Sequence, residues 1–338
     1  MNGSIRTARH GALLLLVSAG ACAHDEPFAP EDHNTRVPFA DTEPARLTWS
    51  EFSDTGPVWL ADGESFLYSF VRTDTPEGDR CLGVLPRTGG QRVGEICRRT
   101  LADRDSIDML DMPAVSAGAR LAYRRAVATP IDGTVWHQEL VAATLDDPLT
   151  ATVLTSIPFT GSDGAFYTSL SQPQWVGESA LAFIGRVEEI VSPCPGCDPF
   201  LIQRNNGIVV VPADGSRTAT LLPGTTEAAS VAGSGDGAIL YAREGDTRIY
   251  RRRLDTGEES VVFDAATAVP GELTASGDRI ALTLPGGILV ADLASGESTT
   301  VPAAGLAELA LSPDGTVLIG EAINSATFDS DLWRVTLP

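Results

Sequence analysis

The sequence predicts an all-β protein: a six-bladed β-propeller of four-stranded antiparallel blades, closed by an N-terminal strand. One strand–turn–strand phrase recurs six times between residues 45 and 338. The 33 glycines and 22 prolines are spread over the whole length, where they separate short segments and leave little room for long helices. The last repeat lacks one strand. Because 43% of the residues are hydrophobic, the chain can bury a sizeable core, and we expect residues 45–338 to form one domain.

The clearest repeat runs from Glu272 to Ala303. It reads ELTAS, a Gly-Asp turn, RIALTLP, a Gly-Gly turn, ILVADLA, a Ser-Gly turn and STTVPA. Alternating apolar residues between such turns are typical of antiparallel strands joined by tight hairpins. Four of these strands in about 32 residues make one propeller blade. The 294 residues from 45 to 338 divide into six blades of 49.

The same phrase recurs in five other copies, which begin at Trp59, Val115, Trp175, Ala232 and Leu311. The last copy contains the turn Ser312-Pro313-Asp314-Gly315, which resembles the signature turn of TolB-type (WD-repeat-like) propellers. This resemblance implies the fold over residues 45–338. It does not imply a function, because that architecture carries enzymes, receptors and scaffolds alike.

Four of the turns carry an aspartate, and together these could form a ring of ligands. We expect each of them instead to accept hydrogen bonds from the backbone of its own turn. The four are Asp62, Asp236, Asp278 and Asp314.

Ring closure follows from the last repeat, which has three strands before the chain reaches Pro338. Residues 45–51 alternate like a strand and precede the first blade. We expect them to supply the missing fourth strand, because this removes an exposed sheet edge. The first strand of each blade should then be innermost.

The first 44 residues resemble the leader and tether of a bacterial lipoprotein. Arg6 and Arg9 precede a short apolar run, GALLLLV, which is followed by SAGA and Cys22. This pattern predicts a signal peptide over 1–21, lipidation of Cys22 and a disordered acidic tether over 22–44. Ala19 stands where a lipobox usually has leucine, so ordinary cleavage after Ala21 is the alternative. We expect an exported protein, anchored by lipid to a bacterial membrane, the outer membrane facing the periplasm or the cell surface.

Four cysteines remain in the exported chain. Cys81 and Cys97 each lie eight residues from Gly89 in a Thr-Gly-Gly-Gln turn, so they should face each other across a hairpin as a disulfide. Cys194 and Cys197 form a CxxC within a Pro/Gly loop. A small structural disulfide is the favoured interpretation, with redox or metal chemistry as the alternatives.

Charge and missing motifs exclude several functions. The formal charge of −21 disfavours nucleic acid as a partner. Lysine is absent, which excludes Schiff-base and P-loop chemistry that depends on lysine. A Ser-His-Asp triad would have to use His137, but the sequence has no G-x-S-x-G nucleophile elbow. We expect His137 instead to be a packed or surface residue of a strand. We therefore assign no catalytic residue, no metal and no cofactor.

The long connections follow the second and fourth strands, and in an antiparallel blade both kinds emerge on one face of the disc. Functional groups often lie on such loops. We expect partners to bind there, and the segments concerned are 98–111, 157–171 and 191–206, with 128–133 and 324–329. The candidate side chains are Asp103, Asp105, Asp108, Asp111, Phe159, Asp163, Phe166, Tyr167, Phe200 and Phe328. A calcium site formed by the first four is a weaker hypothesis, because their spacing matches no known ligand loop; a solvated acidic loop is the favoured interpretation.

Two functions remain. The first is a cell-envelope lipoprotein whose propeller binds another envelope protein or a small ligand, with the lipid as its only contact to the membrane. The alternative is a propeller hydrolase or lactonase-like enzyme that uses carboxylates and a metal at the channel mouth.

Overall fold

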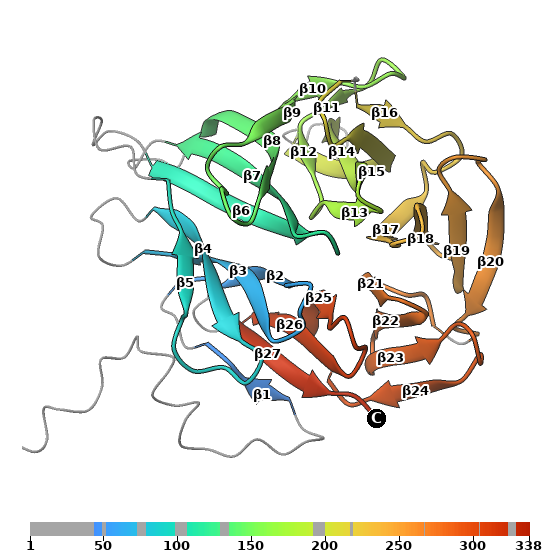
Figure 1. Cartoon of the computed structure of the whole chain (residues 1–338). Helices are drawn as coiled ribbons and strands as arrows, with labels where there is room; N and C mark the ends of the chain where they lie inside the picture. Colours follow the sequence, from blue (N-terminus) through green and yellow to red (C-terminus); the bar gives the residue numbers. More distant parts are fainter. Residues whose placement is uncertain are drawn as a thin grey trace, which may run out of the picture.

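The computed structural model describes residues 44–48, 52–72, 79–98, 107–128, 135–191, 200–216, 219–266, 268–303, 305–323 and 329–338. Their strands form antiparallel blades arranged around a central axis (Figure 1). The predicted all-β propeller is thereby confirmed. No helix among these residues is long and apolar enough to cross a membrane.

The first three blades carry the longest connections. Blade 1 consists of β2 (Thr55–Trp59), β3 (Ser65–Val71), β4 (Arg80–Pro86) and β5 (Gly94–Ile96). Blade 2 consists of β6 (Ile107–Val115), β7 (Arg120–Ala128), β8 (Val135–Thr144) and β9 (Thr152–Ile157). Blade 3 consists of β12 (Ser169–Leu170), β13 (Gln174–Val176), β14 (Ala180–Val191), β15 (Phe200–Pro212) and β16 (Thr220–Leu221). Blades 1 and 2 are continuous through one parallel pair, Arg80 with Met109.

The last three blades are more regular. Blade 4 consists of β17 (Ala228–Gly233), β18 (Ala238–Arg243), β19 (Arg248–Arg253) and β20 (Glu259–Asp264). Blade 5 consists of β21 (Leu273–Ser276), β22 (Arg279–Leu284), β23 (Gly287–Asp292) and β24 (Ser298–Val301). Blade 6 consists of β25 (Leu306–Leu311), β26 (Val317–Ile323), β27 (Ser330–Thr336) and β1 (Ala45–Arg46).

The predicted closure by the N-terminal strand is confirmed. Ala45 and Arg46 of β1 pair with β27, and the Leu47 N–H donates to the Leu332 carbonyl over 2.7 Å. The Arg46 guanidinium forms an ion pair with Asp331. First and last residues of the propeller therefore share one sheet (Figure 1). Residues 49–51, which were expected to extend this strand, lie outside the described residues.

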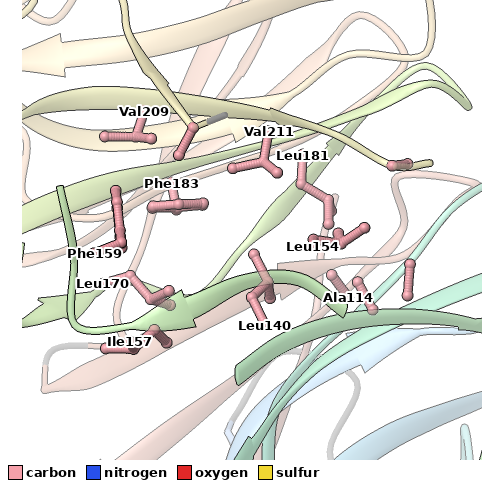
Figure 2. Packing of buried hydrophobic residues seen from close by; sticks show 14 of the residues in the cluster. Ala114, Leu140, Leu154, Ile157, Phe159, Leu170, Leu181, Phe183, Val209 and Val211 are labelled. Atoms are coloured by element: carbon pink, nitrogen blue, oxygen red, sulfur yellow. The ribbon is translucent and has the colours of Figure 1, made fainter. Parts of the chain in front are cut away.

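The inner strands contact their neighbours around the ring, as expected for first strands. β2 touches β6 and β25, β13 touches β6 and β17, and β21 touches β17 and β25. Apolar clusters fill the spaces between blades. Figure 2 shows one cluster, in which Leu140 and Leu154 of blade 2 pack against Leu181 and Phe183 of blade 3. Such burial of whole apolar side chains is the main stabilising term of the fold.

The disulfide between Cys81 and Cys97 is present, with Cα atoms 4.8 Å apart. Cys81 lies in β4, and Cys97 directly follows β5, which pairs with β4. Cys194 and Cys197 lie outside the described residues, as do Cys22 and everything predicted for residues 1–43. Three of the four turn aspartates behave as expected: Asp62, Asp236 and Asp314 each accept a backbone N–H two residues onward.

Two predicted loops contain more regular structure than expected. Segment 157–171 is not open, because β10 (Phe159–Thr160) and β11 (Phe166–Tyr167) form a hairpin and β12 pairs with β14. Segment 98–111 ends early, because β6 begins at Ile107 and pairs with β7. Local polarity suggested loops at both places, whereas pairing with a neighbouring strand decided the structure.

Candidate functional site

Two cavities lie along the central axis, one towards each face. The short-turn mouth is a cavity of about 360 Å³ lined by the ends of the inner strands, including Trp59, Trp175, Ala275 and Pro313. The long-loop mouth is a cavity of about 180 Å³ at the beginnings of the inner strands. Its lining includes Met112, Ser171, Gln172, Gln174, Arg186, Ser230, Glu272, Glu308 and Leu309. Gln172, Gln174 and Leu309 line both cavities.

The inner strands are irregular at the level of the long-loop mouth. Register shifts interrupt β2, β6, β17 and β25 there, and blade 3 divides its inner edge between β12 and β13. Met112 and Glu308 adopt positive φ angles of 51° and 47° at these shifts. Bulges and left-handed non-glycine residues re-aim side chains and are found next to functional sites.

One position of the repeat provides most of the lining. Counting back four residues from the last residue before each inner turn gives Gly56, Met112, Gln172, Ser230, Glu272 and Glu308. Five of these six line the long-loop mouth. A Cβ built on the sixth, Gly56, would lie 3.6 Å from both Gln172 Oε1 and Glu308 Oε2. Equivalent repeat positions with different chemistries therefore meet at one point on the axis.

Glu272 and Glu308 connect three successive blades. The carboxylate of Glu272 in blade 5 accepts the backbone N–H groups of Glu308 and Leu309 in blade 6. Glu308 Oε2 in turn accepts the N–H of Gly56 in blade 1 over 2.6 Å. Burial, and then the charge of Glu308, raises the pKa of Glu272.

A third carboxyl, Glu321, lies behind these two on β26. Its side chain is 8% exposed, and its Oε2 atom has no hydrogen-bond donor among the described residues. Burial, and then the charge of Glu308, raises the pKa of Glu321 above its ordinary value. A protonated Glu321 shares its proton with Glu308, which is the arrangement that two adjacent carboxyl groups require at neutral pH.

The opposite wall of the cavity is polar. The Gln172 side-chain amide donates to the Pro113 carbonyl over 2.9 Å, which links blades 3 and 2. The Ser230 hydroxyl is buried without a hydrogen-bond partner among the described residues. Arg186 also lines the cavity, and its charge acts to lower the pKa of Glu272. Two carboxylates and one guanidinium thus line the long-loop mouth.

A second pair of buried carboxyl groups, Asp54 and Asp331, lies on the same side of the disc, where β1 closes the ring. The Asp54 N–H donates to the Ser330 carbonyl over 2.9 Å, and the Thr48 hydroxyl donates to Asp331 over 3.4 Å. Burial raises the pKa of Asp54 to about 8, although a hydrogen bond from Thr48 opposes the shift. This carboxyl is held in its neutral form by the fold.

The residues predicted from sequence lie elsewhere. Phe159 and Tyr167 are buried and stacked, with ring centroids 4.9 Å apart, so Tyr167 is not the exposed loop aromatic that its place in 157–171 suggested. Asp163 accepts the Tyr167 hydroxyl over 3.1 Å and the Ala165 N–H over 3.2 Å. Phe166 alone among these aromatics is exposed, at 58%. Its role in binding stays a prediction.

Room for Tyr167 comes from two glycines. A Cβ on Gly161 or Gly185 would lie 2.6 or 2.5 Å from atoms of its ring. The hairpin β10–β11 is therefore fixed to blade 3 by an aromatic anchor.

The structure describes only part of the acidic segment 98–111. Asp108 and Asp111 are buried in β6, where Asp111 forms a two-point ion pair with Arg124 at 2.7 and 2.5 Å. They are not the solvated loop acids that we expected. Asp103, Asp105 and Phe328 lie outside the described residues, as does the side chain of Phe200. The described residues contain no group of three His, Cys, Asp or Glu side chains that could hold a metal ion.

Sequence reasoning missed Glu272, Glu308 and Glu321. An available pattern would have found the first two: Glu-Leu-Thr-Ala-Ser and Glu-Leu-Ala-Leu-Ser stand at the same place in their repeats. Glu321 lies in an apolar strand and has no such pattern. His137, as expected, is a strand residue, and its Nε2 lies 3.1 Å from Glu139.

No protein-family model and no curated protein sequence matches this chain. Several solved propellers are similar in structure. Oligogalacturonate lyase in complex with manganese matches with a TM-score of 0.47 and 12% identity, over 87% of this chain and 93% of that chain. Luciferin-regenerating enzyme matches with a TM-score of 0.49 and 12% identity, over 87% and 95%. Regucalcin from Agrobacterium tumefaciens, a calcium-binding protein, matches with a TM-score of 0.47 and 13% identity, over 88% and 94%. At these identities the similarity concerns the propeller fold alone.

Proposed function

We propose that this protein is a cell-envelope lipoprotein whose propeller binds a partner protein or small ligand at the long-loop mouth. One observation carries the proposal: a single repeat position brings side chains of different chemistry from successive blades into one cavity. A concave pocket with a few convergent polar groups is where ligands usually bind. A propeller that served only as a spacer would not require bulged inner strands or buried unpaired polar atoms at this point. On the turn at 312–315, we also propose that its blades are of the TolB type.

A plugging experiment tests this site. Ser230→Phe places a ring in the long-loop mouth, and Ala275→Phe is the matched control in the short-turn mouth. The full chain serves as bait in solubilised envelope. We expect Ser230→Phe to lose the captured partner and Ala275→Phe to keep it, with both variants folded by circular dichroism.

Hydrogen exchange on the captured complex then locates the contact. Protection should appear at residues 228–231 and 306–309, which begin inner strands. Protection at 59–63 and 313–315 instead would assign binding to the opposite face and end this proposal.

The lipid anchor is part of the proposal. A lipidated Cys22 and the acidic segment after it would tether the propeller to the membrane, with no other membrane contact. Mass spectrometry of the mature N-terminus should find acylated Cys22, and Cys22→Ser should release the protein into the soluble fraction. An unmodified N-terminus at Cys22 or Ala23 would contradict the anchor. The net charge of −21 supports the exclusion of nucleic acid as a partner.

A second function has its own observation. The neighbouring carboxyl groups of Glu308 and Glu321, one of them protonated, could act as general base and general acid in a hydrolase or lactonase. The metal that this alternative also invoked finds no ligand set among the described residues. Turnover of a panel of lactones and aryl esters, abolished by Glu321→Gln, would establish the enzyme; a panel without turnover would remove it.

A further inference from the structure

We propose that the long-loop mouth binds a primary ammonium group, held between Glu308, Glu272 and the hydroxyl of Ser230. The proposal rests on the proposed function, because it names the ligand chemistry of the same site. It follows from the charge of the lining, from unused acceptor positions on two carboxylates and from the unpartnered hydroxyl of Ser230.

The charged side chains that line the cavity carry a net negative charge. Glu272 and Glu308 contribute two carboxylates, whereas Arg186 contributes one guanidinium. An anionic ligand would meet two like charges in a site of reduced dielectric, where charge interactions are strong. A cation is therefore the favoured occupant.

The two carboxylates retain acceptor capacity. An ionised carboxylate has about four acceptor positions. The N–H groups of Glu308 and Leu309 occupy two on Glu272, and the N–H of Gly56 and the proton shared with Glu321 occupy two on Glu308. These bonds fix the orientation of both groups without filling them, which is how a preorganised site is built.

A hydroxyl at the cavity lacks a hydrogen-bond partner and points to a missing ligand group. Ser230 Oγ is buried, and Ser230 lines the cavity without a partner for this atom among the described residues. Buried polar groups are nearly always hydrogen-bonded, so this orphan requires an explanation. An ammonium bound beside Ser230 and Glu308 would donate to the hydroxyl and to the carboxylate.

An ammonium fits this arrangement better than a metal ion. A metal needs several ligands at about 2.0–2.6 Å, and no such group exists among the described residues. An ammonium donates up to three hydrogen bonds at about 2.7–2.9 Å, so its acceptors can be farther apart. A cavity of about 180 Å³ admits a group of this size on a short alkyl chain.

Calorimetric titration of the full chain tests the chemistry. The probe is n-butylammonium chloride, compared with tetramethylammonium chloride, which has the same charge and no N–H donor. We expect the first to bind at least about tenfold more tightly, since a hydrogen bond to a charged group has about this value. Calcium chloride and manganese chloride are titrated in the same way, to test whether the cavity binds a metal ion instead.

Two isosteric variants locate the site. Glu308→Gln keeps an acceptor for the Gly56 N–H and loses the charge; it should weaken butylammonium binding at least about tenfold. The control is Glu178→Gln at the short-turn mouth, where Glu178 also accepts a neighbouring blade's N–H, that of Gly118, over 2.7 Å. This variant should bind like the wild type.

Several results would overturn the proposal: equal binding of the two ammonium ions, equal loss in both variants, binding of calcium or manganese alone, or no binding of any probe. Partner capture that is lost in Ser230→Phe would still support the proposed function in each of these cases. The failure of the ligand class and the failure of the site are thus separate results.

The ammonium could belong to a free amine or to a lysine of a partner. A lysine-containing peptide and its Nε-acetylated form distinguish these sources. A peptide that competes with butylammonium, when the acetylated form does not, indicates a protein partner; a peptide that never competes, while butylammonium binds, indicates a free amine.

Discussion

The two mouths of the channel use carboxylates in opposite ways. At the short-turn mouth, burial alone would raise the pKa of Asp314, but hydrogen bonds from Ser312, Arg87 and Thr316 together hold it well below its ordinary value. At the long-loop mouth and the ring closure beside it, burial raises the pKa values of Glu272, Glu321 and Asp54. The short-turn carboxylate is satisfied as an anion, whereas the long-loop carboxyls are held in an unfavourable environment.

This difference in pKa bears on which carboxyl groups stabilise the fold and which do not. A satisfied anion stabilises the turn that surrounds it, as Asp314 does for its own turn. A buried carboxyl with a raised pKa costs stability, so it persists where it serves another purpose or where neighbours enforce it. We therefore expect mutations at the short-turn mouth to weaken the fold and mutations at the long-loop mouth to affect binding and the pH dependence of stability.

The largest expected effect concerns the two tryptophans of the short-turn mouth. The indole N–H of Trp59 donates to the Ala310 carbonyl of blade 6, and that of Trp175 to the Ala114 carbonyl of blade 2, each over 3.0 Å. Each ring also lies under an arginine. Trp59→Ala and Trp175→Ala should each cost about 3–5 kcal/mol of unfolding free energy. Denaturant melts measure this, and Trp→Phe variants, which keep most of the apolar contact, should lose less.

Asp54→Asn should have the next largest effect, with a defined pH dependence. The folded chain keeps a proton on Asp54 up to pH about 8, while the unfolded chain releases it near 3.8. The folded state then binds more protons, so the contribution of this group to stability falls as pH rises from about 4 to about 8. Asparagine cannot ionise. The variant should match the wild type near pH 4 and melt a few degrees higher at pH 8.5.

Asp292→Asn is the opposing control for that titration. Hydrogen bonds from the backbone and hydroxyl of Ser295 lower the pKa of Asp292. Its contribution is present above the pKa of the unfolded state and lost at lower pH, so this variant should lose stability at neutral pH and converge with the wild type in acid. If the melting temperatures of Asp54→Asn and the wild type depended on pH in the same way, the pKa of Asp54 would not be raised, and the contrast between the two faces would be wrong.

The smallest effects concern the β10–β11 hairpin, which lies in a long connection away from the axis. Tyr167→Phe loses hydrogen bonds to Asp163 and Asn206 and should cost about 1 kcal/mol. Phe166→Ala removes an exposed ring and should change stability by less than about 0.5 kcal/mol. Thermal melts and partner capture together measure both; reduced capture with Phe166→Ala would extend the binding surface from the mouth to this hairpin.

The architecture could be predicted because it depends on patterns that repeat along the chain. The turn spacing defined the blades, and the missing strand of the last repeat predicted the pairing of β1 with β27. The disulfide followed from two cysteines placed symmetrically about one turn. Loop lengths pointed to the long-loop face, and binding at that face stays a prediction. Its residues were sought in the polar loops, whereas the structure brings together inner-strand residues such as Glu308.

The sequence by itself determined that this chain is a closed propeller, since hydrophobic alternation, turn residues and strand number are local and countable. Only the tertiary structure decided which side chains meet and how they are charged. Gly56 and Glu308 are 252 residues apart in the chain and form one hydrogen bond at the mouth. The pKa of Asp54 depends on its burial and on residues from both ends of the chain, through a hydrogen bond with Thr48 and the charge of Asp331. Burial and charge depend on neighbours in space, which the order of residues along a strand does not reveal.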